Sequence, residues 1–234
     1  GSLPRIVRRQ TSKAVFDMAF GRDLLADATR LVASSRAESR QYEAMGMPTA
    51  KVDIVPNGID SSAYGDLPVR GTFARKFGLE GRRLVTYIGR INERKGLDTL
   101  LRAFEILQKT RTDLTLCFVG PDEGYQTRLE GLARQLGVAH RVRFTGLATG
   151  RDRLGAFVDA EVLIYPATDE AFGRVPFESL LCGTPVVVTD DSGSGELLAE
   201  VGGGLTFQRG NASQLAEAIA VTLEDRTQAA DTVR

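Results

Sequence analysis

The sequence lacks the features that mark several classes of protein. Its 234 residues include 30 Lys and Arg against 30 Asp and Glu, so no net charge attracts nucleic acid or an anionic membrane over a long range. No apolar run approaches the roughly 20 residues that span a bilayer, and the first residues lack the charged-then-apolar pattern of a secretion signal. We therefore expect a globular protein without a nucleic-acid partner.

Cysteine and histidine are scarce. Cys117 and Cys182 each lie in an apolar run, which suits reduced thiols in a core and predicts a reducing compartment. The sequence has no Cys and His cluster with zinc spacing, and no Asp-x-Asp pair that would hold a divalent cation against a phosphate. We therefore predict chemistry that requires neither a metal nor another cofactor. The single histidine, His140, is predicted to lie in a surface loop or at a strand edge.

From Leu84 onward, short buried-strand patterns alternate with amphipathic helices. Strands are expected at 84–88, 114–119, 142–144, 161–165 and 185–189, and helices at 97–107, 126–136, 153–158, 175–181, 195–200 and 213–223. This alternation predicts a doubly wound α/β domain with a parallel sheet. Because ligands bind beyond the carboxyl ends of such strands, the functional residues are expected in the loops after Ile88, Val119, Phe144, Tyr165 and Thr189.

The first 59 residues follow a different pattern. Helices are expected at 6–25 and 36–45 and strands at 29–33 and 52–55, which are too few elements for a separate domain. We interpret residues 1–59 as the end of a preceding α/β domain, 60–83 as a linker that leads into the next domain, and 84–234 as the main domain. The basic stretch from Arg5 to Lys13 fits a membrane-touching helix or the solvated face of a domain helix, and Asp17 and Asp23 favour the second interpretation.

Two basic residues flank the turn after the first strand of the main domain. Gly89 and Arg90 follow the strand, and Lys95 lies beside the start of the next helix at Gly96. Both cations can converge on the free amides of a helix N-terminus, which is a setting suited to phosphate. A solvated turn with two surface cations is the alternative interpretation.

The segment after Tyr165 contains two glutamates. Glu170 lies in the loop, Gly173 allows a ligand to approach the backbone closely, and Glu178 lies in a helix whose first turn holds Pro176. The Glu178 carboxylate either balances the helix dipole or accepts two hydroxyl protons from a ribose. The backbone amides of residues 172–175 are expected to face a phosphate, and Glu170 to reach the sugar beyond it.

This segment resembles a known signature. Glu170 and Glu178, separated by seven residues and followed by Gly183-Thr184-Pro185, are similar to the glutamate pair of the family 4 retaining glycosyltransferases of GT-B architecture. The stretches 55–60, 89–96 and 118–120 resemble that family's interdomain junction, diphosphate-binding loop and third strand end. The resemblance covers about residues 27 to 220, with the motifs in the family's order.

The resemblance implies a Rossmann-like domain, one half of a GT-B enzyme, that binds a nucleotide-diphosphate sugar for transfer of a hexosyl group. Arg90 and Lys95 would hold the diphosphate, and Glu178 would hold the ribose. Glu170 would bind the donor sugar and stabilise it as its bond breaks. The other implied donor-binding residues are Gly89, Gly146, Leu147, Phe172, Gly173, Arg174 and Val175. The implied mechanism needs no metal and no cofactor besides the donor.

The resemblance also implies a missing partner domain. The family's acceptor-side domain, with its glycine loop and histidine, would lie upstream of residue 1, so the chain alone is expected to bind nucleotide but to transfer poorly. The acceptor, which is a glycan, a lipid or a small molecule, stays unidentified. A cytoplasmic location is expected, with peripheral attachment to a membrane as an alternative.

Two rival functions stay open. One is a non-catalytic sugar-nucleotide-binding or scaffold module of the same fold, against which the intact set Arg90, Lys95, Glu170 and Glu178 argues. The other is a phosphorylase-type or epimerase-type relative of the same architecture.

The segment 192–196 departs from the family's Gly-Gly-x-x-Glu pattern, which leaves the role of Glu196 open. Gly193-Ser194-Gly195 is interpreted as the start of a helix.

Overall fold

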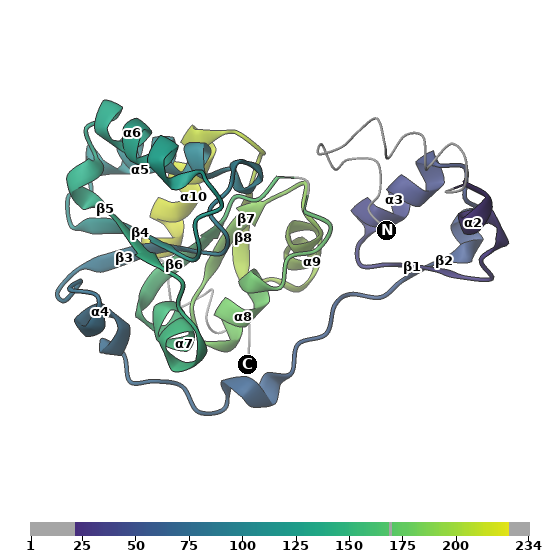
Figure 1. Ribbon diagram of the computed structural model, residues 1–234, viewed down its shortest axis with the longest axis horizontal. Helices are drawn as coiled ribbons and strands as arrows, with labels where there is room; N and C mark the ends of the chain where they lie inside the picture. Colours follow the sequence, from purple (N-terminus) through teal and green to yellow (C-terminus); the bar gives the residue numbers. More distant parts are fainter. Residues whose placement is uncertain (1–21, 169, 225–234) are drawn as a thin grey trace.

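The computed structural model describes residues 22–168 and 170–224, and a six-stranded parallel sheet forms its centre (Figure 1). The strands are β3 (Arg83–Ile88), β4 (Leu114–Val119), β5 (Val142–Gly146), β6 (Ala160–Tyr165), β7 (Val186–Thr189) and β8 (Gly204–Phe207). Their order across the sheet is β5-β4-β3-β6-β7-β8, and every neighbouring pair is parallel. This is the doubly wound, Rossmann-like order, so the predicted fold class is confirmed.

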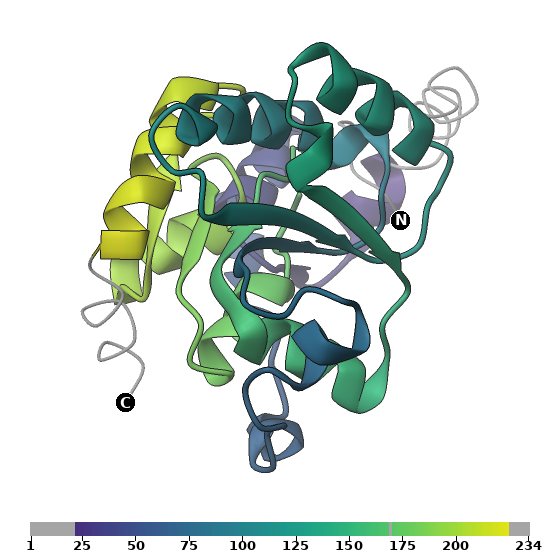
Figure 2. The same ribbon diagram turned by 90° about the vertical axis from the view of Figure 1, so that its left-hand side faces the viewer.

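Helices cover both faces of this sheet (Figures 1 and 2). One face packs against α5 (Leu97–Gln108), α6 (Gln126–Gln135) and α10 (Ala212–Glu224). The other packs against α4 (Thr72–Lys76), α7 (Gly150–Asp159), α8 (Val175–Leu181) and α9 (Gly193–Val201). The nearly complete burial of β3, β4 and β6 follows from this double cover, because helices shield both faces of these strands from water.

A smaller unit precedes this sheet in the chain. It consists of α2 (Arg22–Asp27), β1 (Leu31–Ala33), α3 (Arg36–Ala44) and β2 (Val52–Ile54), with β1 and β2 paired in parallel. The predicted helix at 36–45 and the predicted strands at 29–33 and 52–55 are therefore confirmed within about two residues. Most of the predicted helix at 6–25, and the basic stretch from Arg5 to Lys13, lie outside the described residues.

One helix and one strand of the main domain are absent from the sequence-based expectation. The predicted linker contains α4, whose Phe73 is 1% exposed and packs in the core beneath the sheet. A five-residue helix is too short to show periodicity, so it was missed. The edge strand β8 was not predicted either, because it is only four residues long and starts with Gly204 after two further glycines. Helix α9 also starts at Gly193 rather than Gly195, with the Ser192 hydroxyl accepting a hydrogen bond from the Gly195 amide.

The scarce residue types lie where their environments were predicted to be. Cys117 and Cys182 are free and buried, and burial raises the pKa of each thiol to about 12. His140 is exposed in a 3-10 turn.

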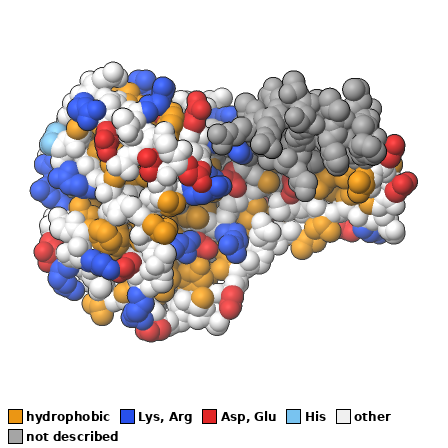
Figure 3. All heavy atoms as spheres, in the orientation of Figure 1, with side chains coloured by type: hydrophobic (Ala, Val, Ile, Leu, Met, Phe, Trp, Pro, Cys, Tyr) orange, Lys and Arg blue, Asp and Glu red, His pale blue; other side chains and the backbone are white. Residues whose placement is uncertain are grey.

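Basic and acidic side chains are interspersed on the face of the molecule that Figure 3 shows, and the chain contains equal numbers of the two kinds. Within the part of the chain that the structure describes, no helix is long and apolar enough to cross a membrane.

Candidate functional site at the strand ends

The loops after β3 and β6 meet at the centre of the sheet. Chain connections diverge from these two neighbouring strands, to β4 on one side and β7 on the other, which is the switch point where doubly wound folds bind ligands. Gly96 adopts a left-handed conformation (φ 65°), and a Cβ atom there would collide with the Pro166 carbonyl. Thr168 donates from its amide and its hydroxyl to the Arg94 carbonyl, at 3.0 and 2.8 Å. The two loops are therefore held against each other.

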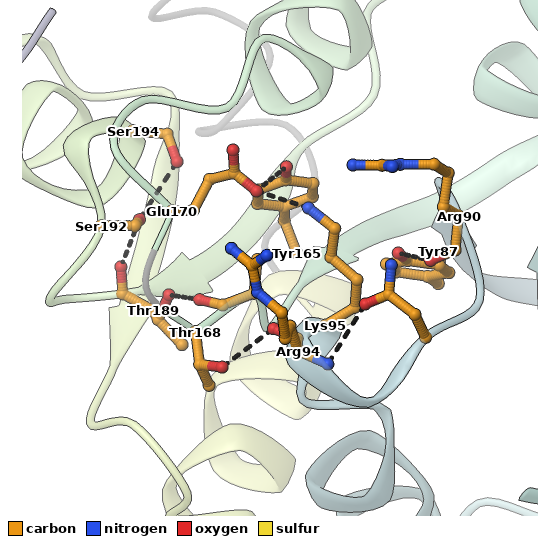
Figure 4. A network of polar contacts seen from close by, with 12 residues as sticks. Tyr87, Arg90, Arg94, Lys95, Tyr165, Thr168, Glu170, Thr189, Ser192 and Ser194 are labelled. Carbon is orange, nitrogen blue, oxygen red and sulfur yellow. Dashed lines mark hydrogen bonds and ion pairs between the residues drawn. The ribbon is translucent and has the colours of Figure 1, made fainter. Parts of the chain in front are cut away.

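Lys95 and Glu170 form an ion pair across these loops (Figure 4). The Lys95 ammonium donates to Oε2 of Glu170, and the Tyr165 hydroxyl donates to the same oxygen at 3.2 Å. The Lys95 nitrogen also lies 5.5 Å from the centre of the Tyr165 ring. Burial, followed by the nearby Glu170 charge, raises the pKa of Tyr165, so the phenol keeps its proton and acts as a donor.

Arg90 is paired with a carboxylate from a third strand end. Its Nη1 lies 3.1 Å from Oε1 of Glu123, in the loop after β4, and Asn92 donates to the other Glu123 oxygen at 2.7 Å. The hydrogen bond from Asn92, together with that from Arg90, lowers the pKa of Glu123. The Tyr87 hydroxyl donates to the Arg90 carbonyl at 2.8 Å, which holds the start of the loop.

These residues surround a cavity of about 740 Å³ at the switch point. Such a volume is within the range of small-molecule sites. The cavity is lined by Arg90, Asn92, Glu93, Arg94, Lys95, Glu123, Gly124, Tyr125, Thr168 and Glu170. Three cations and three carboxylates thus face one space. An anionic ligand competes with Glu123 for Arg90 and with Glu170 for Lys95, because these carboxylates pair with the two cations.

The start of α9 supports the Glu170 loop through backbone hydrogen bonds, and Figure 4 shows the side chains of Ser192 and Ser194 from this helix start. The Gly193 amide donates to the Glu170 carbonyl at 3.4 Å, and the Ser194 amide donates to the Phe172 carbonyl at 2.8 Å. The Ser192 hydroxyl is buried and donates to the Thr189 carbonyl at 2.9 Å. These bonds position the Glu170 backbone independently of its side-chain partners.

Glu178 lies apart from the wall of this cavity. It is 7% exposed on α8, and its carboxylate pairs with Arg153 of α7. Burial, followed by the charge of Glu178, raises the pKa of Tyr64. The structure thus brings Arg90, Lys95 and Glu170 together, while Glu178 lies in the helix that follows the Glu170 loop and pairs with Arg153.

The remaining predicted residues flank the cavity without lining it. Gly89 leaves β3, and its amide donates to the Val119 carbonyl at 2.9 Å. Gly146 ends β5 with φ 73°, and Leu147 beside it is 67% exposed. The other four residues form the turn into α8: Phe172, which is buried, Gly173, Arg174, which is exposed, and Val175. Their roles in donor binding stay predictions.

Comparison with known proteins identifies the family. The family model described as "Glycosyl transferases group 1" matches residues 69–234. The chain belongs to the glycosyl transferases group 1 family. A D-inositol 3-phosphate glycosyltransferase of Actinosynnema mirum is 36% identical over 176 residues, covering 70% of this chain and 42% of that protein. One from Nocardia farcinica is 30% identical over 215 residues, covering 88% and 47%. The chain therefore spans less than half the length of these curated relatives.

Solved structures share the fold. HepE from Anabaena, in complex with UDP, superposes with a TM-score of 0.80 at 23% identity, covering 92% of this chain and 62% of that one. WaaG, a glycosyltransferase involved in lipopolysaccharide biosynthesis, gives 0.79 at 26% identity, covering 98% and 64%. This glycosyltransferase group 1 chain thus has the Rossmann-like sheet of a GT-B protein.

Several residues at the site of this glycosyltransferase group 1 chain were not predicted. Tyr87, Asn92 and Glu123 hold the Arg90 loop, and Arg153 and Tyr64 surround Glu178. The end of β4 indicates that the loop after Val119 belongs to the site, but the sequence does not show that Glu123 is the residue that contributes, because a surface glutamate has no sequence signature.

In the described residues, no three or more His, Cys, Asp and Glu side chains cluster to hold a metal ion, and metal independence stays a prediction.

Proposed function

We propose that this chain is the donor-binding half of a family 4 retaining glycosyltransferase, which binds a nucleotide-diphosphate sugar and transfers its hexosyl group. One observation carries the proposal: Arg90, Lys95 and Glu170 line a single cavity at the switch point of the sheet. Two cations and a carboxylate are the groups that a diphosphate and a sugar hydroxyl, respectively, require.

Each residue has a chemical role in this proposal. Cleavage of the bond between the sugar and the diphosphate leaves negative charge on the leaving group, which Arg90 and Lys95 neutralise. Glu170 accepts sugar hydroxyl protons and stabilises positive charge on the departing sugar. Glu178 binds the ribose, for which its carboxylate must exchange Arg153 for the sugar hydroxyls. Because the two cations neutralise the leaving group, a divalent metal is not required.

The proposed organisation assigns residues 1–59 to the end of an acceptor-side domain, 60–83 to a linker and 84–234 to the donor domain. The acceptor, whether a glycan, a lipid or a small molecule, then binds in a cleft that this chain completes only in part. The buried free thiols support a cytoplasmic location.

Calorimetric titration with UDP-, GDP- and ADP-glucose tests donor binding. We expect one of the three to bind, and Lys95→Ala to weaken its affinity about tenfold or more, because a charge-assisted hydrogen bond contributes about 1.5–3 kcal/mol. Glu178→Ala should weaken binding similarly. Lys109→Ala and Glu105→Ala are matched controls, since that pair lies on the surface of α5 outside the cavity.

Two results would count against the proposal. The absence of heat with all three donors would favour a module that does not bind sugar nucleotides. Equal affinities for Lys95→Ala, Glu178→Ala and the two controls would place the binding site elsewhere.

A further inference from the structure

We propose that Tyr165 is a positioning residue: it holds the Glu170 carboxylate in place when Lys95 exchanges Glu170 for the donor diphosphate. The inference rests on the proposed function, because it assigns the diphosphate to Lys95 and the sugar to Glu170. Tyr165 itself would contact neither the diphosphate nor the sugar through its hydroxyl, which acts through Glu170.

The exchange follows from the pairing of charges in the cavity. Lys95 and Glu170 are 13% and 28% exposed, and the ammonium and the Tyr165 hydroxyl share one oxygen, Oε2. A diphosphate brings more negative charge than a single carboxylate, so it outcompetes Glu170 for the lysine. Once Lys95 has turned away, Tyr165 is the remaining side-chain partner of Glu170 among residues 22–168 and 170–224.

Tyr165 is fixed in position by its surroundings. It is 5% exposed at the end of β6 and pairs with Val188 of β7. Its ring lies against Gly173, where an added Cβ atom would be 2.7 Å from the ring carbon Cε1. The anchor for Glu170 therefore belongs to the rigid sheet and stays in place when the ion pair opens.

The chemistry of the phenol suits this role. Its raised pKa keeps it protonated, so it donates to the carboxylate at any ordinary pH. The Lys95 nitrogen lies 5.5 Å from the centre of the Tyr165 ring, which stabilises the cation beside Glu170 before the exchange. One side chain thus contacts both partners of the pair (Figure 4).

Tyr165→Phe isolates the hydroxyl, because it keeps the ring that contacts Lys95 and Gly173. The readout is the ratio of the Kd for UDP-glucose to the Kd for UDP, measured by calorimetry, with the ADP and GDP pairs tested in parallel. We expect Tyr165→Phe to raise this ratio about tenfold while the Kd for UDP changes by less than about twofold, since only the sugar depends on Glu170. A residue that merely supports the fold would weaken both ligands together.

Tyr87→Phe is the matched control. It also removes a buried phenol hydroxyl at a strand end beside the cavity, but that hydroxyl donates to the Arg90 carbonyl and not to Glu170. We expect Tyr87→Phe to leave the ratio unchanged. In a Glu170→Ala background, Tyr165→Phe should no longer change the ratio, because the side chain through which it acts is absent.

The outcomes separate this inference from the proposed function. A wild-type chain that binds none of the sugar nucleotides or nucleotides overturns the proposed function and this inference with it. Binding with an unchanged ratio in Tyr165→Phe overturns only the role of Tyr165. The role of Tyr165 is also overturned if Tyr87→Phe raises the Kd ratio as much as Tyr165→Phe does. It is overturned as well if Tyr165→Phe raises the ratio in the Glu170→Ala background as much as it does in the wild type.

Discussion

Single residues at the strand ends explain why glycine is needed at particular positions. Gly173 has φ 81°, and a Cβ atom there would meet the Tyr165 ring at 2.7 Å. Gly183 has a similar φ of 75° but nothing within 4 Å of its would-be Cβ. A Cβ atom would therefore bring similar backbone strain at both positions, and a steric clash with a side chain only at Gly173.

We predict that Gly173→Ala lowers the free energy of unfolding more than Gly183→Ala does. The left-handed backbone alone costs a non-glycine residue about 1–2 kcal/mol, and the clash at Gly173 should add about 1–3 kcal/mol. Urea unfolding of both variants measures the difference. Equal losses would show that the Tyr165 ring moves aside without cost.

At the scale of elements, the carboxylate of Asp159 explains why helix α4 forms although its own sequence contains no capping residue. Helix α4 starts after Gly71 without a side-chain cap of its own. Asp159, at the end of α7, accepts hydrogen bonds from the Gly71 and Ala74 amides at 2.5 and 2.7 Å. The cap lies 85 residues away from Ala74, so no sequence window includes both.

Asp159→Ala is predicted to destabilise the protein by about 2–4 kcal/mol, because two amides lose a charged acceptor and the site is only 6% exposed. Asp152→Ala is the control on the same pair of helices. Its ion pair with Lys76 is more exposed, at 37% and 56%, and should contribute less than about 1 kcal/mol. Thermal unfolding compares the two, and similar losses would contradict the role of Asp159 as a cap.

An element could be predicted where the pattern that identifies it lies within its own residues. The alternation of apolar residues predicted β3, β4, β6 and α5 to within one residue, since each of these elements shows its burial in its own sequence. Strand β8 and helix α4 have no such pattern in their own sequences. Strand β8 is short and starts with a glycine, and helix α4 is capped by Asp159 from a distant part of the chain. Strand ends likewise predicted where Arg90, Lys95 and Glu170 lie, but not their counterions.

At the scale of the whole molecule, the small N-terminal unit docks on the sheet domain through α3 and α9. Glu196 accepts a hydrogen bond from the Ala37 amide at 3.1 Å and pairs with Arg40. A second, more exposed pair joins Arg36 to Glu200 at 2.8 Å. The start of α9 also supports the Glu170 loop, so one helix contacts both the N-terminal unit and the candidate site.

Glu196→Gln is predicted to increase hydrogen exchange in α3 several-fold, because the amide side chain weakens both the bond to Ala37 and the pair with Arg40. Glu200→Gln removes only the exposed pair and should leave the exchange nearly unchanged. Mass spectrometry of the peptide that covers residues 36–44 measures both. An equal response would mean that Glu196 has no special part in docking.

The sequence by itself determined the doubly wound fold and the placement of Arg90, Lys95 and Glu170 at strand ends, because periodicity and strand ends are local properties. Only the tertiary structure decided which strands are neighbours and which charges meet. Lys95 pairs with a carboxylate 75 positions away, and Arg90 with one 33 positions away. Such partners are chosen by the order of strands across the sheet, which no stretch of sequence contains.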